Sequence, residues 1–144
     1  MLKRFAFAAS VLALACAVSG AGLSKQSSLA ELEGKWTLVK AEMSGRPLVD
    51  KTGQEIVIKD GQLTSDFKRM GKDPIDLTKA LDPTKSPKMI TVPLQRRIVF
   101  AGIYDVKEGE LRICGDAGRS GRVESSRPKT FDNSNVVLVF KRQK

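Results

Sequence analysis

The most constraining feature of this sequence is a series of short apolar runs, separated by turn residues, that extends from residue 34 to the end of the chain. No window shows apolar residues that repeat with the period of about 3.6 residues of an amphipathic helix. Short runs of this kind, bounded by Gly, Pro and Asp, are typical of all-β domains. We expect eight strands, over residues 34–43, 55–59, 62–67, 75–81, 88–92, 98–106, 110–114 and 136–142.

The connectors between these runs predict a chain that reverses direction repeatedly. Asp60-Gly61 is a strong signal for a two-residue hairpin, and Lys107-Glu108-Gly109 is a good short turn. Further reversals are expected at Gly45-Arg46-Pro47, Asp82-Pro83 and Ser86-Pro87. Sequential strands joined by short turns favour an eight-stranded antiparallel up-and-down barrel, which leaves no unpaired edges; a sandwich is the alternative.

Residues 1–21 have the layout of a secretory signal peptide. Lys3 and Arg4 form a charged start, an apolar run follows over residues 5–18, and small residues occupy 19–21. The apolar run is too short for a membrane span. We therefore expect cleavage after Ala21 and an exported protein, periplasmic or secreted, with no transmembrane segment in the mature chain.

Cys16 offers an alternative to this soluble exported form, because it lies where a lipid-attachment cysteine would lie. Ala15 fits the small residue that directly precedes such a cysteine, but Ala13 and Leu14 fit the earlier positions poorly. Lipid anchoring through Cys16 would change how the protein is held without changing its fold.

The expected mature chain has two parts. Residues 22–33 are predicted to form a polar tether and a short helical turn, because Ser28, Leu29, Ala30 and Glu31 match a capping box. Residues 34–144 then form one β-domain, which is large enough to bury an apolar core.

This domain is basic and keeps one cysteine. Lys3 and Arg4 are the only charged residues of the expected signal, so the chain's net charge of +9 becomes +7 after cleavage. Only Cys114 remains, so no intramolecular disulfide forms. The basic residues are dispersed, as on a solvated surface, and export argues against nucleic acid as a partner. An anionic cell-surface polymer would be attracted by the same charge.

Few residues in this chain are suited to catalysis or to metal binding. The sequence has no histidine, which removes Ser-His and Cys-His pairs and the commonest neutral metal ligand. Carboxylate pairs such as Asp73 with Asp76 and Glu108 with Glu110 lie in or beside turns, where carboxylates are normally solvated. We expect no enzymatic activity, no cofactor and no metal site, with the Cys114 thiol acting as a small buried apolar group.

Residues 115–134 are an exception to the pattern of short turns. This stretch is rich in Gly, Ser, Arg and Lys and is long for a connector inside a compact domain. Such loops are usually functional or disordered. Its Gly-rich start lacks the Gly-Lys-Ser/Thr ending and the following helix of a phosphate loop, so a flexible turn is the simpler interpretation.

Gly34-Lys35-Trp36, which follows the short helical turn, is similar to the Gly-x-Trp signature of lipocalins. The resemblance implies that Trp36 closes one end of the barrel and that a basic side chain from the last strand packs across its ring. Arg142, with Lys141 beside it, is the candidate partner. A guanidinium over an indole contributes about 0.5–2 kcal/mol, so the pairing would be structural.

A wider set of motifs covers most of the mature chain and resembles a lipocalin-like domain family of unknown function that is numerous in planctomycete bacteria. The matching segments are residues 32–36 (LEGKW), 81–88 (LDPTKSPK), 102–104 (GIY), 111–114 (LRIC), 127–131 (RPKTF) and 139–142 (VFKR). This resemblance implies a fold and no established activity.

Two functions follow from these observations. The first is an exported binding protein that holds a small apolar ligand in its barrel. The candidate lining residues are Leu38, Ile56, Ile58, Phe67, Phe100 and Tyr104. The alternative is a protein-interaction module, an inhibitor or a cell-envelope scaffold, that acts through its N-terminal tether or the 115–134 loop. A filled barrel would favour interaction with a protein, and an open apolar cavity would favour a ligand.

Overall fold

The computed structural model describes residues 20–68, 71–132 and 134–144, with the side chains of the first helix described from residue 26. That helix, α1 (Gly20–Leu32), replaces the tether and single helical turn expected over residues 22–33. The signal prediction falls mainly on residues 1–19, outside the described part of the chain. In the described part, no helix combines the length and apolarity needed to cross a bilayer.

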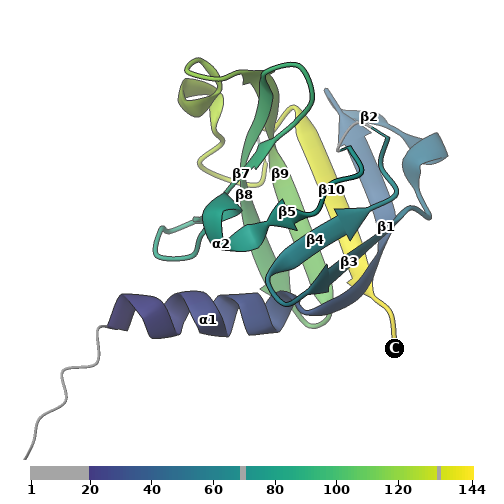
Figure 1. Ribbon diagram of the computed structural model, residues 1–144. Coiled ribbons are helices and arrows are strands. Elements are labelled where there is room, and N and C mark those ends of the chain that lie inside the picture. Colours follow the sequence, from purple (N-terminus) through teal and green to yellow (C-terminus); the bar gives the residue numbers. More distant parts are fainter. Residues whose placement is uncertain (1–19, 69–70, 133) are drawn as a thin grey trace, which may run out of the picture.

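The rest of the chain forms one curled antiparallel sheet, which confirms the all-β class (Figure 1). Its strands are β1 (Gly34–Met43), β2 (Arg46–Pro47), β3 (Glu55–Lys59), β4 (Gln62–Ser65), β5 (Ile75–Asp76), β6 (Leu81–Asp82), β7 (Lys88–Pro93), β8 (Ile98–Lys107), β9 (Glu110–Arg119) and β10 (Val136–Arg142). Their order is β5-β4-β3-β1-β10-β9-β8-β7-β6, with β2 paired to β1.

The predicted eight strands and closed barrel are wrong, because the strand expected over residues 75–81 is interrupted. Asp76 accepts a hydrogen bond at 3.0 Å from the backbone N–H of Thr78 and caps the one-turn helix α2 (Leu77–Ala80). This turn separates β5 from β6, which are the two edges of the sheet. Each edge strand has only two residues. The sheet is therefore a partial barrel, whose two edge strands are connected by α2.

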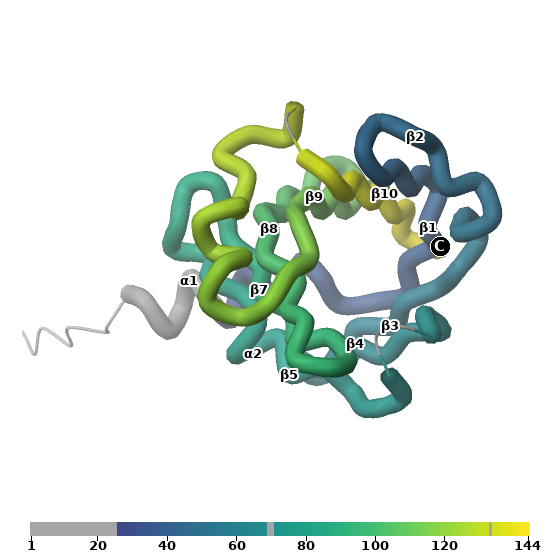
Figure 2. Tube along the Cα trace, turned by 90° about the horizontal axis from the view of Figure 1, so that it is seen from above, coloured from purple at the N-terminus to yellow at the C-terminus, as the bar shows by residue number. Residues whose placement is uncertain are grey.

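The two ends of this partial barrel differ. At one end, β1 begins at Gly34 directly after α1, which lies across that end of the sheet (Figure 1). At the other end, which we call the mouth, β1, β4, β7 and β9 finish and β8 and β10 begin. Figure 2 shows the chain as a ring around the interior.

Apolar side chains from all parts of the sheet fill this ring. The buried cluster consists of Leu32, Trp36, Leu38, Ala41, Ile56, Ile58, Leu63, Ile75, Leu77, Ala80, Leu81, Ile90, Val92, Tyr104, Leu111, Ile113 and Phe140. α1 adds Leu32 at one end and α2 adds Leu77 and Ala80 between the sheet edges. The interior is therefore an apolar core of the kind that stabilises a domain without disulfides.

Two predicted hairpins are present. Asp60 and Gly61, with φ of 52° and 72°, join β3 to β4, while Glu108 and Gly109, with φ of 53° and 75°, join β8 to β9. Positive φ at both central residues is the requirement of a type I′ turn, which the Asp-Gly and Glu-Gly pairs meet. β9 continues to Arg119, five residues beyond the predicted end, because it pairs along the whole of β8.

A pair of glycines allows a close approach between β8 and β9. Gly102 and Gly115 are register partners, and the ring of Phe100 lies against both. A Cβ atom on Gly102 would lie 2.3 Å from the carbonyl oxygen of Cys114 and 2.9 Å from the Phe100 ring. Glycine within a strand often marks such a close approach.

Replacing Gly102 with Ala should therefore destabilise the protein by about 1–3 kcal/mol, the usual range for overpacking. Gly118→Ala is the matched control in the same strand pair, because its Cβ would lie 3.6 Å from Val123, an ordinary contact. Urea unfolding measures both free energies. Equal stabilities for the two variants would contradict the close approach at Gly102.

Candidate functional site

Trp36 and Arg142 meet at the end of the sheet covered by α1. They are register partners on β1 and β10, and the Arg142 guanidinium lies 4.5 Å from the centre of the indole ring. Trp36 is fully buried, and its Nε1–H donates a hydrogen bond of 2.8 Å to the carbonyl of Leu32. The contact expected from the Gly-x-Trp motif and the basic last strand is present.

Arg142 also binds the end of α1. Its Nη1 donates to the carbonyl of Glu33 at 2.5 Å, and its Nη2 donates to the carbonyl of Glu31. The last carbonyls of a helix have no partner within the helix and attract cations. Arg142, at the end of β10, therefore contacts both the end of α1 and Trp36 of β1. This is the geometry of a structural closure. Lys141 is exposed and points away from the interior.

Replacing Trp36 with Ala should cost about 3–5 kcal/mol, the usual range for a large buried aromatic side chain. Arg142→Ala should cost less, and a double-mutant cycle by urea unfolding should show about 0.5–2 kcal/mol of coupling. Lys141→Ala is the control and should add independently to Trp36→Ala. Independent addition of Arg142→Ala would mean that the ring contact contributes nothing.

The six predicted lining residues all belong to the core or its edge. Leu38, Ile56, Ile58 and Tyr104 are each at most 2% exposed. Phe67 and Phe100 are half-buried and pack against the same cluster, although β4 ends two residues before Phe67. The Phe67 ring meets Phe140 edge to face, with 6.3 Å between centroids. These side chains pack against one another and so occupy the interior in which a ligand was expected.

Tyr104 is the polar group of this core. It is 2% exposed, and within the described structure its hydroxyl has no hydrogen-bond partner. Burial raises the pKa of Tyr104 to about 12, and the negative charges of Glu31 and Asp82 act in the same direction. Lys88, which pairs with Glu31 at 3.7 Å, lies 6.0 Å from the centre of the Tyr104 ring.

This burial predicts a loss of stability at high pH. The unfolded chain releases the phenol proton near pH 10, whereas the folded chain keeps it up to about pH 12. The contribution is complete below pH 10 and is lost as the pH rises through 12. Tyr104 is the only tyrosine, so the near-ultraviolet absorbance of the phenolate reports it directly. A midpoint near 10 in the folded protein would contradict its burial.

The long connector after β9 forms a strap, which we define as residues 120–132 and 134–135. It includes the short helix η2 (Val123–Ser126) and packs on the outer face of β8 and β9. It covers a second apolar layer, Ala101, Ile103, Cys114 and Val123, of which none is more than 3% exposed. This packing explains why a glycine-rich and charged segment is held against the sheet.

Arg127 fastens the strap to the sheet, a role that was not predicted from the sequence. Its side chain is 7% exposed, and its Nη1 donates to the carbonyls of Ile90 at 2.9 Å and Gly102 at 2.7 Å. Its Nη2 donates to Thr91 Oγ1 at 2.8 Å and pairs with the Glu124 carboxylate at 2.7 Å. Hydrogen bonds from a charged donor are among the stronger ones.

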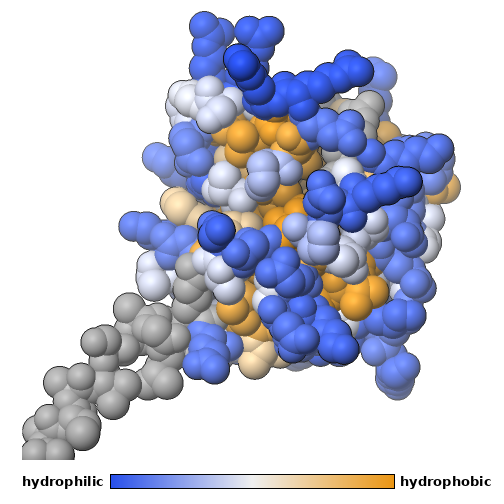
Figure 3. Space-filling view, in the orientation of Figure 1, coloured by the Kyte–Doolittle hydropathy of each residue, from blue (hydrophilic) through white to orange (hydrophobic). Residues whose placement is uncertain are grey.

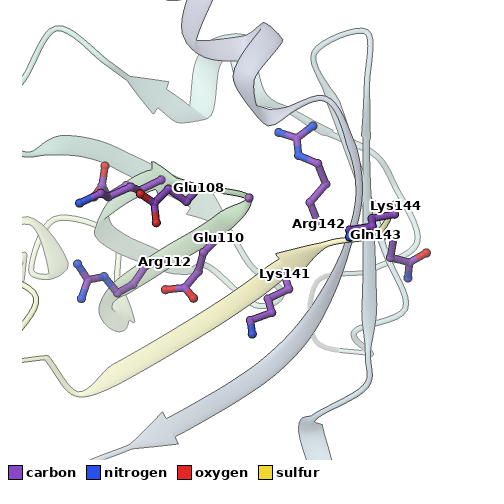
Figure 4. Close-up of a pocket in the computed structure, with 10 residues that line it drawn as sticks. Glu108, Glu110, Arg112, Lys141, Arg142, Gln143 and Lys144 are labelled. Atoms are coloured by element: carbon purple, nitrogen blue, oxygen red, sulfur yellow. The ribbon is translucent and has the colours of Figure 1, made fainter.

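Two of the hollows on the surface of the described residues adjoin β10. The first, about 710 Å³, runs beside the β8–β9 turn and the end of β10, and its walls alternate acidic and basic side chains. Figure 4 shows Glu108, Glu110, Arg112 and Lys141 around it, with the Arg142 guanidinium directed towards α1. Since Arg142 is occupied at that junction, this hollow offers only exposed and mixed charges.

The second hollow, about 520 Å³, combines apolar and charged walls. We call it the valine groove, after Val39, Val137 and Val139 on the outer face of β1 and β10. A register shift between Leu38 and Lys40 marks a bulge at Val39, which is 43% exposed. The strap supplies Phe131, whose ring lies 4.3 Å below the Arg112 guanidinium. The bulge and the strap thus both contribute to a groove lined by apolar and charged side chains.

The other candidate groups, Cys114 and Asp76, have structural roles. Cys114 is fully buried under the strap, and burial raises the pKa of its thiol. The Asp76 carboxylate caps α2, and its hydrogen bond from the Thr78 hydroxyl lowers its pKa. Across the described ranges, no three carboxylate or thiol side chains lie close enough together to hold a metal ion.

Comparison with family models, with curated proteins and with solved structures found no match to this chain. The lipocalin-like resemblance therefore stays a prediction from sequence motifs, and the function must be argued from the geometry.

Proposed function

We propose that this protein is an exported, non-enzymatic interaction module that binds a protein partner through the valine groove. Of the two functions considered from the sequence, this is the alternative, and the observation that favours it is the filled interior. Trp36, Leu38, Leu77 and Leu111 are each less than 2% exposed and pack in a single cluster. A small apolar ligand would have to displace these side chains.

The valine groove has the composition of a protein interface. Its lining combines three valines and an aromatic ring with five charged side chains, Lys40, Glu42, Glu110, Arg112 and Asp132. Interfaces commonly combine apolar and polar side chains, with aromatic residues and arginine contributing most of the binding energy. Because the lining carries both signs of charge, the fitting partner is a protein segment with apolar, acidic and basic side chains.

The strap supports this assignment because it is both docked and placed at the groove. Phe131, Asp132 and Ser134 come from the strap and line the groove. Arg127 and the buried layer around Cys114 hold the strap against β8 and β9. A preformed groove loses less conformational entropy on binding than a flexible loop would. The loop suggested by the sequence thus contributes as one wall of a fixed surface.

A photo-crosslinking amino acid at Val139, in protein expressed in its own host, tests this proposal. We expect one discrete protein adduct from Val139 and none from Val57, a valine of similar exposure on the outer face of β3. Val137→Asp should abolish the adduct while the urea-unfolding free energy changes by less than about 1 kcal/mol.

Equal adducts from Val57 and Val139 would contradict a specific groove. A lipid bound one to one in native mass spectra of the same preparation would favour the ligand-binding function instead.

A further inference from the structure

Four exposed arginine residues lie at or beside the mouth of the partial barrel. Arg96 and Arg97 form the turn between β7 and β8, and Arg119 ends β9. Arg119 is the register partner of Ile98, which places it beside that turn, and Arg122 follows three residues later. We call these four residues the arginine corner. All four are exposed, and the ion pairs found among the described residues involve other side chains.

Arg96 and Arg97 have backbone conformations that are unfavourable for residues with a side chain. Their φ angles are 60° and 61°, and the strand ends are joined by a hydrogen bond of 2.7 Å from the Leu94 N–H to the Ile98 carbonyl. Two central residues at positive φ define a type I′ turn, for which Asn-Gly is the preferred pair. Side chains with a Cβ are disfavoured there, and such strain tends to occur at binding sites.

An apolar lip adjoins the arginine corner. Side chains alternate along a strand, so Leu94, Ile98 and Phe100 share the inner face with the core residues Ile90, Val92 and Tyr104. Leu94 and Phe100 are half-buried, and Ile98 is 39% exposed. Figure 3 shows hydrophobic surface in the upper part of the molecule, beneath hydrophilic projections, where Figure 1 places β7 and β8.

We propose that the arginine corner and its apolar lip form a docking surface for an anionic phospholipid bilayer. The guanidinium groups would bind lipid phosphates, for which their planar, forked donors are suited. Ile98 would enter the boundary between headgroups and acyl chains, as apolar residues of membrane-surface proteins do. A soluble phosphate polymer would satisfy the arginines but leave Ile98 in water, which is why the bilayer is the better fit.

This surface is distinct from the valine groove and does not depend on the proposed function. The groove lies on the outer face of β1 and β10, whereas the lip belongs to the inner face of β7 and β8 at the mouth. The domain would thus have one surface for a membrane and another for a protein.

The test uses the full chain with Ile98→Trp as a reporter at the lip. Trp36, the only natural tryptophan, is fully buried and supplies a constant background. Vesicles of phosphatidylcholine with phosphatidylglycerol should shift the emission of the new tryptophan to the blue, and vesicles of phosphatidylcholine alone should not. The reporter responds only to its own surroundings, so binding by residues 1–19 cannot produce the shift.

Changing Arg96, Arg97, Arg119 and Arg122 to Gln in this background should weaken the vesicle-induced shift at least a hundredfold in lipid concentration. A basic residue near an anionic surface contributes about fivefold, the equivalent of about 1 kcal/mol. The matched control changes four exposed lysines at the α1 end, Lys35, Lys59, Lys107 and Lys141, to Gln. It removes the same charge and should weaken the shift by about fivefold or less.

Several outcomes would overturn the proposal. They are an unchanged emission with anionic vesicles, an equal shift with neutral vesicles, and an equal loss in the lysine control. Binding of soluble polyphosphate that requires the four arginines, without any vesicle response, would assign the corner to a phosphate polymer instead.

Discussion

The contact between Trp36 and Arg142 links three parts of this structure, α1, β1 and β10. The indole fills the end of the core beneath α1 and donates to Leu32, while the guanidinium lies on the ring and binds the last carbonyls of the helix. β1 and β10 are paired along their length, and this contact lies at the end of the pair that adjoins α1. It thus fastens α1 to the central strands and covers the end of the core.

The curvature of the sheet is the second constraint, and it decides what the interior can hold. Gly102 and Gly115 let β8 and β9 approach each other closely beside the Phe100 ring, and α2 connects the two short edge strands, β5 and β6. A small ring of this kind is filled by the side chains of its own strands. The exposed apolar side chains therefore lie outside the core, among them Val39 in the valine groove and Ile98 at the lip of the mouth.

Local signals in the sequence predicted the class of fold and several details. The Asp60-Gly61 turn followed from local turn chemistry, whereas the Trp36–Arg142 contact was implied by the resemblance to the lipocalin Gly-x-Trp signature. The interruption at residues 77–80 was missed because Leu77 and Ala80 also suit a strand, and the capping by Asp76 decides between the two. Only a short helical turn was predicted where α1 lies, because the apolar residues of this segment do not repeat with the period of an amphipathic helix.

The role of the strap could not be predicted, because it depends on contacts between distant residues. Arg127 reaches Ile90 and Gly102, which are 37 and 25 positions away in the sequence. Its acceptors are backbone carbonyl groups, which every residue has, so the residue types do not identify them. The valine groove could not be predicted for a similar reason, since the bulge at Val39 becomes apparent only when β1 is paired with β10.

The central claim is that the interior is a packed core and that binding takes place on the outer surface. Methyl resonances of Leu38, Ile56 and Ile58, which lie at the centre of that core, test it most directly. Titration of the isotope-labelled protein with dodecanoate, observed by NMR, should leave these resonances unshifted. A saturable shift of all three at a one-to-one ratio would show that the interior admits a ligand and would contradict the account.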